Sequence, residues 1–246
     1  MNIIQITDCH LFADSGTVME GVNTEQSLLR VLSAIMENES PDLLLVTGDI
    51  AHDEEFPTYR HLKGCLDKLN VKYYCLPGNH DHPRFLEDIF KEDFVGQFQH
   101  IVYRGWQLIL LSTALPGEVY GRLDDRQLTL LSQVLRKNRE PAVIFMHHHP
   151  VPVQCPWLDE IGLEEPEEFL AVMDSATSVN AVFFGHVHQE FRYLRDGIVF
   201  YGTPSTCFQF KPHSLTVEYD NASPAYRSIR LDDDGLIDTR IVRVKM

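Results

Sequence analysis

Long apolar segments are scarce in this sequence, and their scarcity excludes a membrane-spanning helix. No run approaches the ~20 consecutive apolar residues that a helix needs to cross a bilayer. The first five residues, Met1 to Gln5, carry no basic flank and open no apolar signal region. We therefore expect a soluble protein that is not exported and has no membrane partner.

Cysteine pairs and basic residues are also few. The five cysteines are odd in number, lie far apart and include no C-x-x-C pair, which is typical of a reducing compartment rather than of a disulfide framework. Only 21 basic residues stand against 36 acidic ones, and the formal charge of -15 repels nucleic-acid backbones. The sequence thus predicts a cytoplasmic protein without a nucleic-acid partner, and nothing in it indicates an oligomeric state.

The rest of the composition is that of an ordinary globular chain. Of its 246 residues, 44% are hydrophobic and 23% are charged, so the chain is long enough and apolar enough to bury a core. It contains no linker-like stretch, no low-complexity tract and no repeat. We expect one domain that spans residues 1–246.

Strands and helices alternate through most of the chain. Short apolar runs predict strands at residues 3–7, 43–47, 71–76, 108–112, 142–146 and 181–184. Amphipathic spacing predicts helices at 24–39, 59–69, 128–135 and 166–176, the first with a capping box of Asn23 and Gln26. This order favours an α/β fold with a largely parallel sheet. The last quarter, with strands expected at 190–194, 198–201, 215–219, 226–231 and 237–244, indicates antiparallel β structure, so we expect two sheets within the one domain.

Histidine is the unusual residue, because most of it follows the predicted strands. Five strand ends carry polar clusters, namely Asp8-Cys9-His10, Gly48-Asp49, Gly78-Asn79-His80-Asp81, His147-His148-His149 and Gly185-His186-Val187-His188. Ligands bind at the carboxyl ends of strands in open α/β sheets. We therefore expect the five clusters to form one site.

The chemistry of these side chains indicates a pair of metal ions. In extended backbone, Asp8 and His10 point to the same side, whereas at most two of the three consecutive histidines can do so. The set has no sulfur and includes an amide oxygen, which suits iron(II), manganese or catalytic zinc rather than structural zinc. One carboxylate can bridge two metals ~3.5–4 Å apart, and two dications give an acidic protein a local positive site for a phosphate.

These five motifs, in this order, resemble those of the calcineurin-like metallophosphoesterases. Further segments are similar to the bacterial class III 3',5'-cyclic-AMP phosphodiesterases, among them Gly21-Val22-Asn23-Thr24, Cys155-Pro156-Trp157-Leu158-Asp159 and Thr203-Pro204-Ser205-Thr206-Cys207. The resemblance spans nearly the whole chain. It implies a four-layer α/β/β/α sandwich of two mixed β-sheets flanked by helices, with a dinuclear metal site at the carboxyl ends of the strands.

The resemblance also implies residue roles. One metal would be held by Asp8, His10, Asp49 and His188, and the other by Asp49, Asn79, His147 and His186, with Asp49 bridging. The family pattern favours His147, although neighbouring His148 and His149 offer the same chemistry. Substrate would contact His10, Asn79, His80, His147 and His188.

The implied reaction is hydrolysis of 3',5'-cyclic AMP to 5'-AMP by a metal-bridging hydroxide. His80 would protonate the leaving oxygen, and Asp53 or Asp81 would orient His80. Trp157 and Leu158 are interpreted as loop packing rather than as a platform for the base. The alternatives are a broader phosphodiesterase acting on 2',3'-cyclic nucleotides or glycerophosphodiesters, and an inactive scaffold of the same fold.

Overall fold

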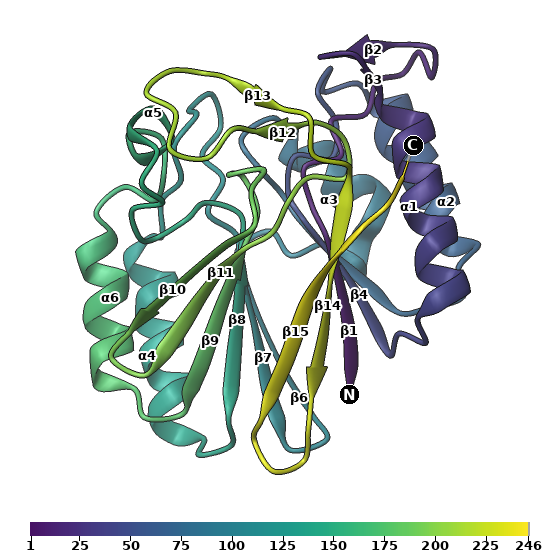
Figure 1. The fold of residues 1–246 in the computed structure, drawn as a ribbon. Helices are drawn as coiled ribbons and strands as arrows, with labels where there is room; N and C mark the ends of the chain where they lie inside the picture. Colours follow the sequence, from purple (N-terminus) through teal and green to yellow (C-terminus); the bar gives the residue numbers. More distant parts are fainter. Residues whose placement is uncertain (246) are drawn as a thin grey trace.

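Two β-sheets pack face to face, and helices cover both outer faces (Figure 1). The structure is a computed structural model that describes residues 1–245. Its four layers confirm the expected α/β sandwich of mixed sheets. In the described part of the chain, no helix has the length and apolarity that a membrane crossing requires.

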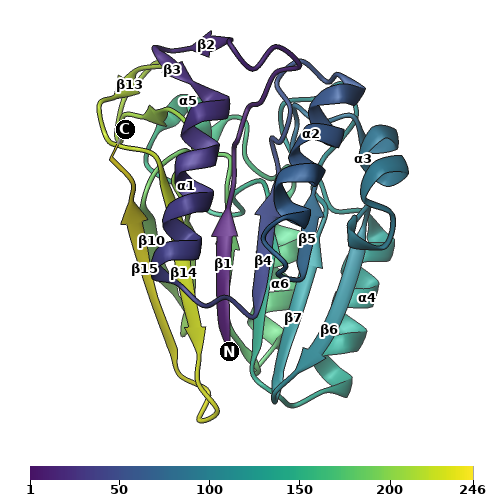
Figure 2. The same ribbon diagram turned by 90° about the vertical axis from the view of Figure 1, so that its right-hand side faces the viewer.

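The first sheet contains the amino-terminal strands. Its order is β15 (Ile237–Arg243), β14 (Ala225–Leu231), β1 (Asn2–Ile6), β4 (Leu43–Thr47) and β5 (Tyr73–Leu76). Strands β1, β4 and β5 are parallel, whereas β14 and β15 pair antiparallel. The outer face is covered by α1 (Thr24–Asn38), α2 (Phe56–Asp67) and α3 (Pro83–Phe90), which is followed by the short η1 (Lys91–Asp93) (Figure 2).

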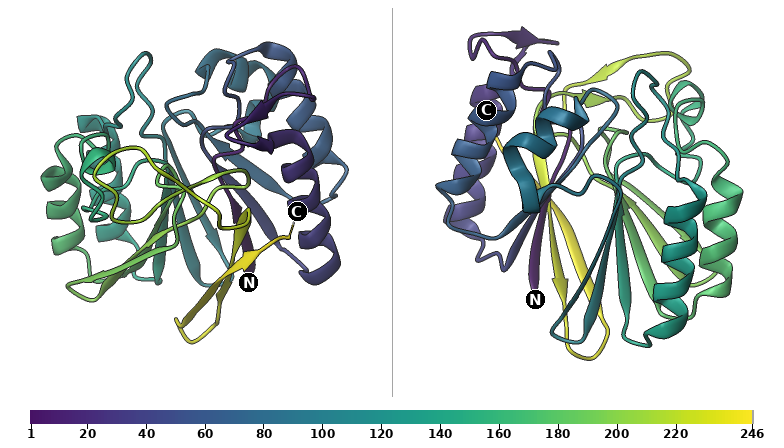
Figure 3. Two further views of the ribbon diagram at one scale, coloured as in Figure 1. Left: turned by 45° about the horizontal axis from the view of Figure 1, so that its top comes forward. Right: turned by 180° about the vertical axis from the view of Figure 1, so that it is seen from behind.

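The second sheet has the order β10 (Phe191–Arg195), β11 (Ile198–Gly202), β9 (Val179–Phe184), β8 (Ala142–Met146), β7 (Trp106–Leu111) and β6 (Phe98–Tyr103). Its four central strands are parallel, and the two edge strands run antiparallel to their neighbours. Helices α4 (Asp125–Lys137) and α6 (Pro166–Ser175) cover its outer face (Figure 3).

Three apolar clusters fill the spaces between these layers. One lies between the first sheet and its helices and includes Leu28 and Leu62, and a second lies beneath α4 and α6 and includes Leu131 and Phe169. The third joins the two sheets and includes Phe145. Because both faces of β4 and β8 are buried, these two strands are almost entirely apolar and carry no charged residue.

The carboxyl ends of the parallel strands all lie at one end of the sandwich, together with its smallest elements (Figure 1). These elements are the hairpin of β2 (Val18–Met19) and β3 (Val22–Asn23), the helix α5 (Pro156–Asp159), and the pair β12 (Gln209–Phe210) and β13 (Tyr219–Asp220). The sandwich therefore presents one loop-rich end for a site.

Three expectations about local structure were wrong in part. Residues 215–219 do not form a strand, since only Tyr219–Asp220 pairs, and the alternating Leu215 and Val217 are exposed. The last quarter is not purely antiparallel, because β11 pairs in parallel with β9. Asn23 caps α1 by accepting the N–H of Gln26, which is half of the expected capping box.

Candidate metal centre

The five loops that leave β1, β4, β5, β8 and β9 converge, and their backbone is unusual. Five of the seven predicted metal ligands have positive φ, at 54° for Asp8, 44° for His10, 50° for Asp49, 66° for His186 and 48° for His188. Non-glycine residues rarely adopt this conformation, and it concentrates at functional sites. The extended backbone expected for Asp8-Cys9-His10 was wrong: left-handed turns, not strand alternation, direct these side chains.

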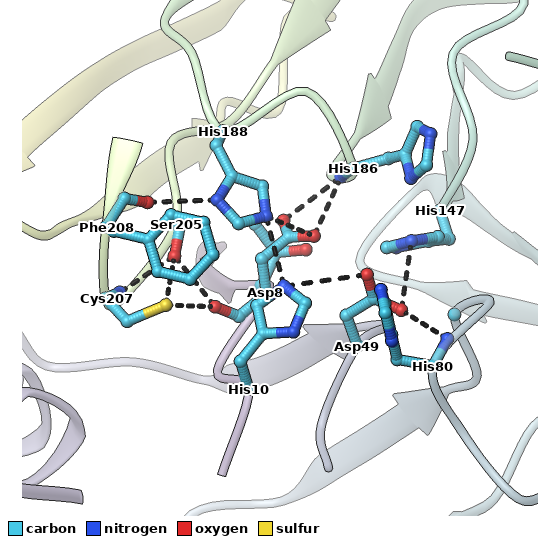
Figure 4. Close-up of polar contacts among 12 residues, drawn as sticks. Asp8, His10, Asp49, His80, His147, His186, His188, Ser205, Cys207 and Phe208 are labelled. Carbon is cyan, nitrogen blue, oxygen red and sulfur yellow. Dashed lines mark hydrogen bonds and ion pairs between the residues drawn. The ribbon is translucent and has the colours of Figure 1, made fainter. Parts of the chain in front are cut away.

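Asp8, His10 and His188 form one half of the cluster (Figure 4). The Nε2 atoms of His10 and His188 lie 3.2 Å apart, and His188 Nε2 lies 3.4 Å from Asp8 Oδ1. His188 Nδ1 donates to the carbonyl of Phe208, which leaves Nε2 of the neutral ring with a free lone pair. Burial lowers the pKa of His10 to about 3, so this ring stays neutral at pH 7 and can ligate a cation.

Asp49 lies between this half and the next. Its Oδ2 is 3.7 Å from His10 Nε2, and its Oδ1 is 3.4 Å from His147 Nε2. Oδ1 also accepts the backbone N–H of His80. The two oxygens of one carboxylate thus face the two halves of the cluster, which is the arrangement that a bridging ligand requires.

The second half of the cluster, around His147 and Asn79, brings several acceptor atoms together. His147 Nδ1 donates to the carbonyl of Thr47, so Nε2 of the neutral ring points a lone pair at Asp49 and at the Asn79 Oδ1, 3.3 Å away. Three acceptors facing one another need a cation between them. Burial lowers the pKa of His147, but the charge and hydrogen bond of Asp49, the charge of Asp8 and the hydrogen bond to Thr47 together raise it to about 9, so a proton on Nε2 lies between these acceptors when no metal is bound. The donor set therefore fits a metal ion.

His186 and the rest of the histidine triplet differ in their surroundings. The backbone N–H of His186 donates to the Asp8 carboxylate, and its ring lies 5.1 Å from the His147 ring and 4.6 Å from the His148 ring. Among residues 1–245, Nε2 of His186 and Nε2 of His148 have no hydrogen-bond partner. His149 stacks on the outer side of His186 at 5.8 Å between ring centroids, and its Nε2, also without a hydrogen-bond partner among residues 1–245, lies 3.8 Å from Asp159 Oδ1. Two of the three consecutive histidines therefore share the side of the cluster.

His80 lies at the edge of the cluster, but the expected orienting acids do not contact its ring. Asp81 accepts the backbone N–H groups of Ile50, Ala51 and Gly78. Asp53 accepts the N–H of Ala13 and the hydroxyl of Thr58. Both carboxylates hold loops in place instead of orienting His80.

His52 is the neighbour of His80 that sequence reasoning missed. The two rings stack with centroids 4.7 Å apart, and His52 Nδ1 lies 3.2 Å from His10 Nδ1. His52 lies beyond the Gly48-Asp49 pair and belongs to no histidine cluster in the sequence, so no motif marks it.

A buried turn supports Asp8 from behind. Ser205 Oγ and Cys207 Sγ both donate to the carbonyl of Asp8, and Gln209 bonds the backbone of Ser205 in both directions. The sequence of the segment from Thr203 onward assigns no role to these polar residues. In the structure they fix the backbone of a predicted ligand.

A cavity next to the cluster has one apolar side, which we call the apolar wall. The cavity is lined by His80, Asp49 and His188 on its polar side. Its apolar side includes Met19, Val119, Trp157, Phe208, Phe210 and Tyr219. Trp157 packs edge-on against Phe210, with ring centroids 4.8 Å apart, so it contributes to loop packing and also faces this cavity.

Two packed mixed sheets with an aspartate- and histidine-rich cluster at their strand ends define an α/β protein with a candidate dinuclear metal centre. The chain belongs to the calcineurin-like phosphoesterase family, whose model matches residues 1–190. Membership implies a dinuclear site for divalent metals.

Curated relatives match along the whole chain. A 3',5'-cyclic-nucleotide phosphodiesterase of Nostoc sp. is 36% identical over 246 residues, which cover 99% of this chain and 92% of that protein. The 3',5'-cyclic adenosine monophosphate phosphodiesterase CpdA of Haemophilus influenzae is 34% identical, with 100% of this chain and 90% of that protein covered. A dimetal phosphatase from Danio rerio has a similar fold, with a TM-score of 0.70 at 15% identity and 99% of each chain covered.

Proposed function

We propose that this protein is a metal-dependent phosphodiesterase that hydrolyses 3',5'-cyclic AMP to 5'-AMP. Full-length relatives with this activity in their names support the substrate. The observation that carries the reaction class is the position of Asp49, whose two carboxylate oxygens face two separate groups of nitrogen and oxygen donors. The five cysteines of this protein are free thiols, and we propose that the protein acts in the reducing cytoplasm, where free thiols persist.

The proposed ligands divide into two groups that share Asp49. Asp8, His10 and His188 would complete one site, and Asn79, His147 and His186 the other. This donor set has no sulfur, so we propose iron(II) or manganese, with zinc as a further occupant. When bound, the two ions would lower the pKa of water and neutralise the phosphoryl oxygens.

His80 is positioned to complete the reaction as a proton donor. Its backbone is tied to Asp49 by the 2.9 Å hydrogen bond to Oδ1, and its ring lines the cavity beside the cluster. Hydrolysis breaks the bond from phosphorus to the ribose O3', and the alkoxide that leaves needs a proton. His80 supplies it as general acid, a role worth ~10²–10⁴-fold in rate.

The apolar wall is suited to the nucleobase. Phe210 and Tyr219 stand side by side with ring centroids 5.8 Å apart and line the same cavity as His80. Aromatic rings stack on bases and add ~1–3 kcal/mol per base. If the phosphate of 3',5'-cyclic AMP binds at the cluster, its adenine would therefore lie against this wall.

Substrate competition tests the proposal. The purified protein is offered 3',5'-cyclic AMP, 2',3'-cyclic AMP and bis(p-nitrophenyl) phosphate, and products are separated chromatographically. We expect 5'-AMP from the first substrate, loss of the activity on chelation, and its return with Mn²⁺. Cleavage of bis(p-nitrophenyl) phosphate without cleavage of 3',5'-cyclic AMP would contradict the assigned substrate.

A substitution in the wall separates base recognition from chemistry. Tyr219→Ala should raise KM for 3',5'-cyclic AMP about tenfold, the equivalent of 1.4 kcal/mol of lost stacking. The same variant should cleave bis(p-nitrophenyl) phosphate, which has no nucleobase, at the unaltered rate. Equal loss on both substrates would show that the wall does not read the base.

A further inference from the structure

A second group of metal-ligating side chains lies on the helical layer, apart from the centre described above. Glu25 lies in the first turn of α1, and His61 and Cys65 lie one turn apart on α2. Residues four apart on a helix share one face, so the imidazole and the thiol point the same way. None of the three belongs to the five motifs at the strand ends.

The donor atoms of these three residues converge. His61 Nε2 lies 2.6 Å from Glu25 Oε1 and 3.6 Å from Cys65 Sγ. One oxygen, one nitrogen and one sulfur all lie within 4.8 Å of one another. The group thus has three different ligand types directed at one point between two helices.

Burial gives the group the shape of an open coordination site. The Glu25 side chain is 11% exposed and Cys65 is 8% exposed, whereas the His61 side chain is 49% exposed. The carboxylate on α1 and the thiol on α2 are therefore held by the packing of these helices, while the imidazole lies on the solvent side of the group.

We propose that Glu25, His61 and Cys65 bind a thiophilic divalent cation of the zinc class. In a tetrahedral zinc site, bond lengths of about 2.3 Å to sulfur and about 2.05 Å to nitrogen separate these two ligands by about 3.6 Å. The observed separation of Cys65 Sγ and His61 Nε2 is 3.6 Å.

The nitrogen and oxygen ligands must move apart for the cation to bind. A tetrahedral site separates them by about 3.4 Å, whereas the hydrogen-bonded pair of His61 and Glu25 is 2.6 Å apart. The half-exposed imidazole is free to make this movement. For the metal to bind, the proton on Nε2 of the neutral His61 ring must pass through solvent to Nδ1, and the Cys65 thiol releases its own proton to solvent as its bond to the metal forms.

The thiolate separates this site chemically from the dinuclear centre. The candidate ligands at the strand ends are nitrogen and oxygen donors, which favour iron or manganese, whereas sulfur favours zinc and its analogues. The two kinds of site should therefore differ in the metals they retain, and loss of a sulfur signature on replacement of Cys65 would assign that signature to this thiol among the five free cysteines.

Cobalt titration of the full-length protein tests the proposal. Co²⁺ added to the reduced, metal-free chain should produce the thiolate-to-cobalt charge-transfer absorption band, and added Zn²⁺ should abolish it. The band should disappear in Cys65→Ser and persist in Asn79→Ala. His61→Ala, which changes a half-exposed side chain, should weaken the affinity measured from the band more than about tenfold.

The matched control is His100→Ala, because His100 lies on β6 and bonds Gln107 far from this group. It should leave the band and the affinity unchanged, and far-ultraviolet circular dichroism should show every variant folded. A wild-type chain without the band at saturating Co²⁺ would overturn the proposal. A band that survives in Cys65→Ser would overturn it equally.

Discussion

At the scale of single residues, the proposed metal ligands are held in position by contacts that their side chains make on the side away from the metal. His10 is the clearest case, since its Nδ1 meets His52 while its Nε2 faces His188. Partners on the far nitrogen of a metal-ligating histidine set its tautomer and orientation. His52 also stacks on His80, so one side chain positions a proposed ligand and the proposed acid together.

Replacement of His52 by alanine should lower kcat/KM for 3',5'-cyclic AMP about 10- to 100-fold, together with metal content. His52→Asn, which keeps a hydrogen-bonding group near His10, should recover part of the loss. His82→Ala is the control, because the His82 ring stacks on Phe85 outside the cluster. Wild-type turnover and metal content in His52→Ala would contradict this role.

Gly48 leaves no room for a side chain beside a predicted metal ligand. Its φ is +101°, and a Cβ there would lie 2.2 Å from His147 Nδ1. Gly48→Ala should displace His147 and lower activity more than about 10²-fold, because His147 loses its place beside Asp49. Gly105→Ala, at φ +77° with no atom within 4 Å of the added carbon, isolates the backbone strain.

Gly105→Ala, the control, should lower the free energy of unfolding by only about 1–2 kcal/mol and leave the rate of hydrolysis unchanged. Activity and metal content, measured on both alanine variants, decide between the clash and the strain. Equal losses in the two would mean that strain alone matters at Gly48.

At the scale of elements, the two sheets are joined by a buried polar contact as well as by apolar side chains. Arg227 on β14 is 3% exposed and donates to the carbonyl of Gly202 and to the hydroxyl of Thr203, at the end of β11. Burial lowers the pKa of Arg227 to about 10, so it remains charged at pH 7. Its guanidinium also lies 5.0 Å from the Tyr201 ring centroid.

Arg227→Ala should lower the free energy of unfolding by about 3 kcal/mol or more, because hydrogen bonds to a buried charge are lost and their acceptors stay buried. Arg230 on the same strand is the matched control, since its side chain is 61% exposed and its ion pairs face solvent. Arg230→Ala should cost less than about 1 kcal/mol. Denaturant titrations that rank the two variants the other way would contradict this account.

Elements fixed by burial were predictable from sequence, and elements fixed by distant contacts were not. Strands β4 and β8 have the predicted bounds because both faces are covered and no charge interrupts them. The two-residue β12 and β13 depend on each other across a loop, and no local pattern marks them. The positive φ values at Asp8 and His188 arise because five loops meet, so sequence motifs identified the residues but not their backbone.

At the scale of the whole molecule, buried neutral histidines make stability depend on pH. His149 has no place in the proposed metal ligation, and burial lowers its pKa from 6.5 to about 3. The unfolded chain therefore binds one more proton than the folded chain between these values. The free energy of unfolding should fall as pH decreases through this range, by about 1.4 kcal/mol per pH unit for this residue.

His149→Gln removes the group that binds this extra proton in the unfolded chain. Its free energy of unfolding, measured by denaturant titration between pH 6 and 4, should decline less steeply than that of the parent by about 1.4 kcal/mol per pH unit. Parallel pH profiles for the parent and His149→Gln would contradict the assignment to His149.

We also propose that residues 1–246 unfold in a single transition, as one domain whose sheets share a core.

The most direct test of the account is anomalous diffraction from crystals grown without chelator. We predict two peaks on opposite sides of the Asp49 carboxylate, one among Asp8, His10 and His188 and the other among Asn79, His147 and His186. A single peak, or none in protein that hydrolyses 3',5'-cyclic AMP, would contradict the dinuclear centre on which the proposed mechanism rests.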